Sequence, residues 1–114
     1  MEKEFGVTGF VVNENYEWKS LGEGLRRKIL GYDKELMLVS VEFKKGVIAN
    51  IHKHSHRQVT YIVKGSFEVT IGTEKKIMKA GDAFYVLPEL EHGVVALEDS
   101  LLTDVFNPHR EDFL

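Results

Sequence analysis

The chain consists of short apolar runs that alternate with turns rich in glycine and charged residues. Within residues 66–71, Phe67, Val69 and Ile71 alternate with polar side chains, which is the pattern of a strand with one buried face. No segment keeps a helical period over three turns, and turn residues recur about every 8–12 positions, as is typical of all-β sandwiches and barrels. The pattern therefore predicts an all-β domain, with strand candidates at residues 10–12, 27–30, 36–43, 47–51, 59–63, 66–71, 75–78, 83–87, 93–97 and 101–106.

Composition narrows the functional classes. The 114 residues suffice for one domain with its own core. A net charge of -3 without a basic block argues against nucleic-acid binding, and no apolar run approaches the roughly 20 residues that cross a bilayer. The chain has no cysteine, which excludes disulfides and thiolate metal ligands. Because the first residues also lack the pattern of a signal peptide, we expect a cytoplasmic protein that binds neither nucleic acid nor membrane.

Three histidines and one glutamine have the chemistry of a metal site. His52 and His54 lie two residues apart between β-forming segments, so on a strand their side chains would point the same way. His92 would add a nitrogen from another strand and Gln58 a carbonyl oxygen, which gives the three or four donors that a first-row metal needs. His56 has the same strand parity and competes with Gln58, unless a local bend turns it away. We expect one divalent transition metal ion per chain, and these donors suit zinc, nickel, manganese, iron or cobalt.

The spacing of these residues resembles the two motifs of the cupin superfamily. In residues 46–65, a glycine precedes the His-x-His pair at the motif distance, position 58 occupies the glutamate slot and a second glycine closes the motif. In residues 81–92, Gly81 precedes His92 by eleven positions, as in the second motif. The resemblance implies a single-domain double-stranded β-helix, or jelly-roll barrel, over residues 1–114, with residues 1–19 as an N-terminal extension.

The sequence departs from the cupin pattern in three ways. The glutamate slot holds Gln58, the proline of the second motif is displaced to Pro88 with Glu89 replacing its inner glycine, and Ala96 replaces the terminal asparagine. The last two changes affect turn shape more than ligation. Three neutral imidazoles and a neutral amide would leave the charge of a divalent metal uncompensated, and such a centre attracts anions. We therefore expect an anionic substrate.

A second group of candidate residues lies near the C-terminus. Asp104 and Phe106 alternate with Leu102 and so share a face, and a carboxylate on an interior face is unusual unless it is paired or functional. The resemblance becomes more specific here, because residues 103–114 are similar to the C-terminal tail of the KdgF-type cupins. The same family is similar at Gln58 and in residues 24–30 and 92–98, so that the likeness runs from about residue 20 to the end.

The KdgF resemblance implies an enzyme that converts 4,5-unsaturated uronate monosaccharides, which are small anionic sugar acids, into linear ketonised acids. By position, the metal ligands would be His52, His54, Gln58 and His92, and the substrate site would contain Asp104, Phe106 and Arg110. Asp104 would move protons during ring opening, Arg110 would hold the carboxylate through two parallel hydrogen bonds, and Phe106 would wall the sugar ring.

Each of these residues also has a purely structural interpretation. Asp104 could pair with Arg110 or Arg27 as a structural bridge, Phe106 could be a core residue, and Arg110 could face solvent. Arg26 and Arg27 could be ordinary surface charges, or one of them could reach the pocket as a second anion clamp.

The alternatives at the level of function are a sugar-binding or sensing cupin without turnover and a three-histidine metal dioxygenase. We also expect a homodimer, because a barrel of this length leaves sheet edges that must be covered. Residues 10–12 could supply a strand that is exchanged across a two-fold axis.

Overall fold

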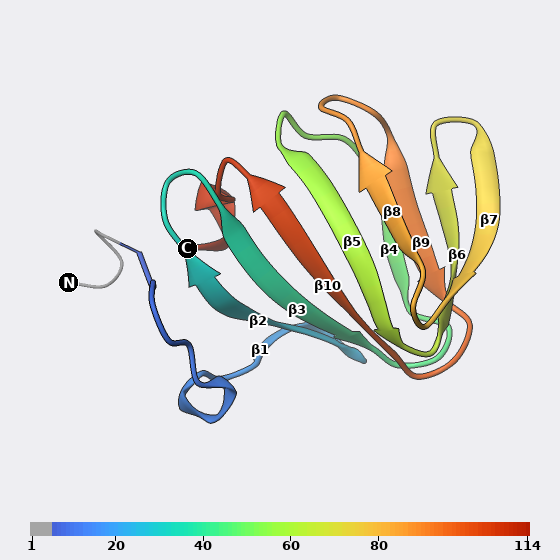
Figure 1. Cartoon of the computed structure of the whole chain (residues 1–114). Coiled ribbons are helices and arrows are strands. Elements are labelled where there is room, and N and C mark those ends of the chain that lie inside the picture. Colours follow the sequence, from blue (N-terminus) through green and yellow to red (C-terminus); the bar gives the residue numbers. More distant parts are fainter. Residues whose placement is uncertain (1–5) are drawn as a thin grey trace.

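The computed structural model describes residues 6–114, which form two facing β-sheets (Figure 1). Residues 1–5, the start of the expected N-terminal extension and part of the segment compared with a signal peptide, lie outside the described residues. Two 3-10 turns, η1 (Asn13–Asn15) and η2 (Glu111–Phe113), are the helical elements of residues 6–114, and neither is long enough to cross a membrane. The strands are β1 (Lys19–Gly22), β2 (Leu25–Tyr32), β3 (Met37–Phe43), β4 (Ile48–His52), β5 (Arg57–Lys64), β6 (Ser66–Ile71), β7 (Glu74–Lys79), β8 (Ala83–Val86), β9 (His92–Ala96) and β10 (Ser100–Asn107).

The strand order shows how the chain winds between the two layers. One sheet has six strands in the order β1-β2-β3-β10-β5-β8, and the other has four in the order β4-β9-β6-β7. All neighbouring strands are antiparallel. From β3 onward the chain crosses repeatedly from one sheet to the other, which is the winding of a jelly roll. This arrangement confirms the predicted all-β fold.

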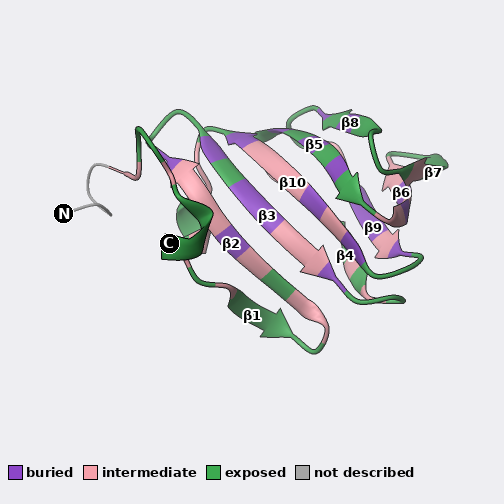
Figure 2. Cartoon of the chain, turned by 60° about the horizontal axis from the view of Figure 1, so that its bottom comes forward, coloured by how far each residue is buried: buried purple, intermediate pink, exposed green. Residues whose placement is uncertain are grey.

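Apolar side chains from both sheets fill the space between the layers. Figure 2 shows bands of buried residues that cross β2, β3 and β10. Phe67 of β6 is fully buried and packs edge-on against Phe43 of β3, with 5.1 Å between the ring centres. Val69 is buried on the same face, as the alternation in residues 66–71 predicted. Each large apolar side chain buried in this way contributes roughly 1.5–3 kcal/mol to stability.

The described part of the N-terminal extension lies against β2 rather than forming a strand of its own. Val7 makes a single β-bridge with Tyr32, and Lys28 donates a hydrogen bond to the side-chain oxygen of Asn13 at 3.1 Å. The strand predicted at residues 10–12 is not present, because these residues have no β-bridge partner within the described chain. Phe10 is fully exposed as a result.

Candidate functional site

Three histidines converge at one end of the space between the sheets. His52 is the last residue of β4, His54 lies in the loop that follows, and His92 is the first residue of β9. Their ring centres are 4.5 Å apart for His52 and His92, 4.8 Å for His54 and His92, and 5.5 Å for His52 and His54. One potential ligand atom from each histidine lies within 4.8 Å of the others. The cluster could therefore hold a metal ion, as the sequence predicted.

The convergence depends on an irregularity in β4. Ala49 pairs with Val94, and regular antiparallel pairing would then place Ile51 opposite His92. A register shift between Ala49 and His52 inserts one extra residue in β4, so that His52 pairs with His92 instead. Strand alternation, from which the sequence predicted that His52 and His54 point together, is therefore not the cause. The two side chains point together because of the bulge and because β4 ends at His52.

Hydrogen bonds to the backbone determine which ring nitrogen of each histidine is free. The Nδ1 atoms of His52, His54 and His92 each lie 2.9 Å from a carbonyl oxygen, those of Asn50, His56 and Leu90 respectively. A carbonyl oxygen only accepts hydrogen bonds, so each Nδ1 carries the proton and each neutral ring keeps a lone pair on Nε2. This is the tautomer that binds metal through Nε2.

His92 shows most clearly that the cluster fits a metal. Its Nε2 is buried and has no hydrogen-bond partner within residues 6–114. Burial, with smaller effects of the neighbouring His52 and His54, lowers the pKa of His92 to about 4, and the hydrogen bond to the Leu90 carbonyl opposes this shift. The ring is therefore neutral at physiological pH. A buried, unpartnered lone pair is costly, and a coordinated cation would satisfy it.

Gln58 supplies a fourth donor atom beside the histidines. Its amide nitrogen donates to Thr60 Oγ1 at 2.9 Å and to Asp104 Oδ1 at 3.2 Å, which turns Oε1 toward His54 Nε2, 2.9 Å away. With the proton of His54 on Nδ1, these two atoms are both acceptors and repel each other unless a cation lies beside them. Two ligands about 2.1 Å from a metal and at right angles lie about 3 Å apart, so the observed separation suits neighbouring ligands.

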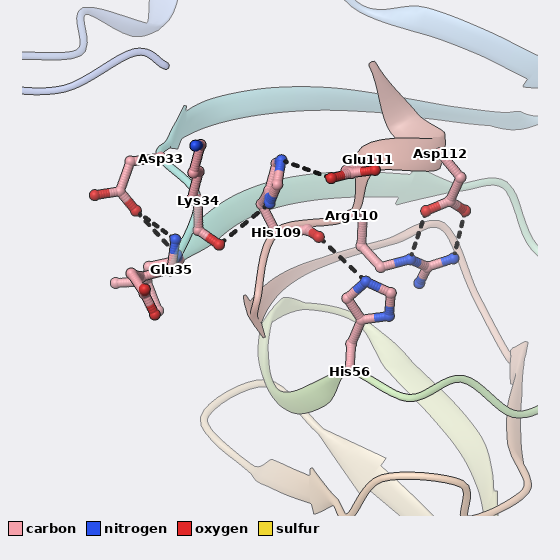
Figure 3. Close-up of polar contacts among 9 residues, drawn as sticks. Asp33, Lys34, Glu35, His56, His109, Arg110, Glu111 and Asp112 are labelled. Carbon is pink, nitrogen blue, oxygen red and sulfur yellow. Dashed lines mark hydrogen bonds and ion pairs between the residues drawn. The ribbon is translucent and has the colours of Figure 1, made fainter. Parts of the chain in front are cut away.

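His56 is turned away from the cluster. It lies in the bend at residues 55–56, and its Nε2 donates to the carbonyl oxygen of His109 at 3.1 Å (Figure 3). His56 is absent from the group of possible ligands within residues 6–114. The His56 ring lies 5.5 Å from the His54 ring, but Gln58 Oε1, and not His56 Nε2, faces the histidine cluster.

Asp104 of β10 faces the same site. Its Oδ1 accepts hydrogen bonds from Thr60 at 2.5 Å and from Gln58 at 3.2 Å. Burial raises the pKa of Asp104 to about 6, although the Thr60 hydrogen bond and the charge of Arg110 oppose the shift. The structural bridge to Arg110 or Arg27 is not formed, because neither arginine is an ion-pair partner of Asp104 in the described chain.

A pocket of about 250 Å³ brings most of the predicted site residues together. Phe106 is almost fully buried and also forms part of the pocket wall, so it has both the core role and the wall role considered from the sequence. Apolar side chains such as Leu25, Val41 and Phe84 form much of the remaining lining. The predicted site residues that line this pocket are His52, Gln58, His92, Asp104, Phe106 and Arg110.

Arg110 lies at the pocket and does not extend into solvent. Its Nε and one terminal nitrogen donate to the two carboxylate oxygens of Asp112 at 3.0 Å and 2.8 Å (Figure 3). The guanidinium carbon lies 5.0 Å from the ring centre of Phe106 and 4.3 Å from that of Phe113. The Arg110 hydrogen bond holds the pKa of Asp112 below its usual range. The C-terminal turn therefore fixes the position of Arg110.

Three further residues of the site were not predicted from the sequence. Thr60 shares the inward face of β5 with Gln58, and strand parity would have identified it. Asp112 and Phe113 reach the site only through η2, and no periodic signal in the sequence marks that turn.

Glu89, which replaces a motif glycine, adopts the left-handed conformation with φ of 64° and donates its backbone hydrogen to the His54 carbonyl at 2.8 Å. The turn thus keeps its shape despite the substitution.

Comparison with known proteins agrees with this geometry. The family model described as Cupin domain matches residues 39–106. The pectin degradation protein KdgF of Dickeya dadantii (strain 3937) is 46% identical over 107 residues, which cover 92% of this chain and 97% of that protein. The structure of KdgF from Halomonas sp. superimposes with a TM-score of 0.90 at 40% identity, and covers 94% of this chain and 99% of that one. An RmlC-like cupin from Shewanella frigidimarina NCIMB 400 gives a TM-score of 0.91 at 41% identity, and covers 94% and 96% of the two chains.

Proposed function

This chain belongs to the cupin family, and we propose that it is a metal-dependent enzyme that converts 4,5-unsaturated uronate monosaccharides into linear ketonised acids. The observation that carries the proposal is the meeting, in one pocket, of His52 and His92 of the histidine cluster with Asp104, Phe106 and Arg110. The similarity to a pectin degradation protein supports a sugar acid as the ligand. His52, His54, Gln58 and His92 would hold a divalent metal, which when bound supplies a positive centre for an anionic sugar.

The residues of the pocket suit ring opening of a cyclic enol ether. A proton adds to the alkene carbon, water adds to the neighbouring ring carbon, and collapse of the resulting hemiketal opens the ring to a keto acid. Asp104 is the carboxyl group positioned to move these protons, because Thr60 and Gln58 bind one oxygen and leave the other free within residues 6–114. Arg110 lies at the pocket with its guanidinium beside Phe106, and Phe106 walls the ring.

Incubation of the purified protein with an unsaturated galacturonate tests the proposal. We expect the ultraviolet absorption of the conjugated double bond to disappear well above the spontaneous rate. Asp104→Asn should abolish this loss and leave the bound metal unchanged, with Asp82→Asn, an acidic residue in the turn before β8, as the matched control. Binding without loss of absorption would instead indicate a sensing cupin, and oxygen uptake would indicate a dioxygenase.

We further propose that the protein is a homodimer. The outer face of the six-stranded sheet supports this, because four apolar side chains follow one another across adjacent strands there and all but Val105 are exposed. The fully exposed Phe10 at the N-terminal extension would be covered by a partner. The row consists of Leu38 of β3, Val105 of β10, Val59 of β5 and Tyr85 of β8.

A further inference from the structure

Arg27 of β2 is a positive charge on the pocket side of its sheet that the proposed function does not use. It alternates with Leu25, which lines the pocket, and pairs across strands with Val41, which also lines it. Its neighbour Arg26 points to the other side, where it forms a surface ion pair with Glu42 at 2.7 Å. Strand alternation thus gives two adjacent arginines with different surroundings.

The guanidinium of Arg27 has no polar partner within residues 6–114. Its Nε is buried without a hydrogen bond, and Arg27 takes part in none of the ion pairs of the described chain. Burial is the main reason that the pKa of Arg27 is lowered, and the carboxylate of Asp112 only partly opposes this effect. A guanidinium whose Nε is buried without a hydrogen bond is unfavourable, and a bound anion would offset part of that cost.

The guanidiniums of Arg27 and Arg110 both pack against the same aromatic ring at the pocket, that of Phe113. The guanidinium carbon of Arg27 lies 3.8 Å from the ring centre of Phe113, and that of Arg110 lies 4.3 Å from it. Phe113 itself lines the pocket. Asp112 already accepts two hydrogen bonds from Arg110, so this carboxylate balances the charge of Arg110. The charge of Arg27 has no such partner in the described chain.

We infer that Arg27 is a specificity-determining residue that binds the carboxylate of the ligand, while Arg110 stays paired with Asp112. This inference rests on the proposed function in that it takes the ligand to be a sugar acid. A planar guanidinium binds a carboxylate through two parallel hydrogen bonds. The unpartnered Arg27 thereby gains the anion that it lacks in the free protein.

Binding of galacturonate and of its uncharged methyl ester separates a charge effect from a structural one. Both ligands lack the reactive double bond, so affinity is measured without turnover. In Arg27→Met, which keeps an apolar stem, we expect the dissociation constant for galacturonate to rise at least about tenfold, with little change for the ester. Arg27→Lys should recover part of the affinity, and the control Arg26→Met should change neither ligand.

Three results would overturn the inference. The first is wild-type protein that binds the acid no more tightly than the ester. The second is an Arg27→Met variant that keeps its affinity for the acid. The third is an Arg27→Met variant that loses affinity for both ligands alike and has a lower melting temperature, which is the signature of a structural role at Phe113. Turnover of unsaturated galacturonate is measured separately. Turnover without Arg27-dependent binding removes only this inference, and Arg27-dependent binding without turnover removes only the proposed activity.

Discussion

At the scale of single residues, the three histidines of the cluster each donate a hydrogen bond from Nδ1 to a backbone carbonyl oxygen two positions away. The rings are thereby prepared for ligation by main-chain contacts and not by neighbouring side chains. The spacing of His52, His54 and His92 was enough to predict that these three residues lie together. The tautomers could not be predicted, because they depend on where the carbonyls of the bend and the turn point.

Replacement of single histidines should separate ligands from neighbours. His92→Ala should lower metal affinity by roughly 100-fold or more, since loss of a ligand costs more than the 10–100-fold lost with an outer partner. His56→Ala is the matched control and should keep its metal, because His56 faces the carbonyl of His109. Metal content after dialysis against a graded chelator measures the difference. Equal metal loss in both variants would contradict the assignment of Gln58 as fourth donor.

Glu89 offers a second test at this scale. A non-glycine residue in the left-handed conformation costs roughly 1–2 kcal/mol, whereas glycine adopts it freely but loses more backbone entropy on folding. Glu89→Gly should therefore range from neutral to about 1 kcal/mol more stable, measured by urea unfolding. Glu91→Gly, two residues along and without a positive φ, should lose roughly 0.5–1 kcal/mol. Destabilisation of both variants to the same extent would argue against strain at Glu89.

At the scale of elements, the site depends on how closely β4 approaches β9. A Cβ atom at Gly93 would lie 2.9 Å from the carbonyl oxygen of Ala49 and 3.0 Å from the amide nitrogen of Ile51. Both are backbone atoms, so the strands would have to move apart. The bulge that sets His52 opposite His92 lies in the same stretch of β4. Close backbone contact and ligand geometry are therefore coupled.

Gly93→Ala tests this coupling. We expect a loss of stability of roughly 1–3 kcal/mol from the forced separation of β4 and β9. We also expect metal affinity to fall at least about tenfold, because His52 and His92 sit on the two strands that separate. Val95→Ala, on the same strand but only partly buried, should keep its metal affinity. A Gly93→Ala protein with normal metal binding would show that the bulge tolerates the extra atom.

Some of these elements have a clear signal in the sequence and others do not. The alternation at Phe67 and Val69 predicted β6 correctly, because a strand with one buried face has a regular period. The bulge in β4 could not be predicted, since an inserted residue breaks that period without a distinct residue type to mark it. Residues 10–12, predicted as a strand, pair with no strand of the described chain, because β-forming residues also need a neighbouring strand.

At the scale of the whole molecule, the outer face of the six-stranded sheet carries exposed apolar side chains. Tyr61, Val63 and Tyr85 are each about half exposed there. On the other sheet, Ile48 and Ile51 of β4 and Ile77 of β7 are each more than half exposed. The charged Glu68 of β6 interrupts the cross-strand row between Ile48 and Ile77, whereas the row on the six-stranded sheet contains no charged residue.

Light scattering tests the dimer directly. We expect a mass of about twice 13.0 kDa for the wild-type protein. Tyr61→Glu should shift it to the monomer, because a charge on the covered face would be buried without a partner. Ile77→Glu should leave the dimer intact. A wild-type mass of one chain would remove the proposal of a dimer.

The backbone origin of the imidazole orientation has one further consequence. Side chains around the cluster can be exchanged over evolutionary time without loosening the rings, because the acceptors that hold them belong to the main chain. Residues such as Arg27 and Phe113 are then free to vary, and new preferences among acidic ligands can arise while the coordination chemistry is inherited unaltered.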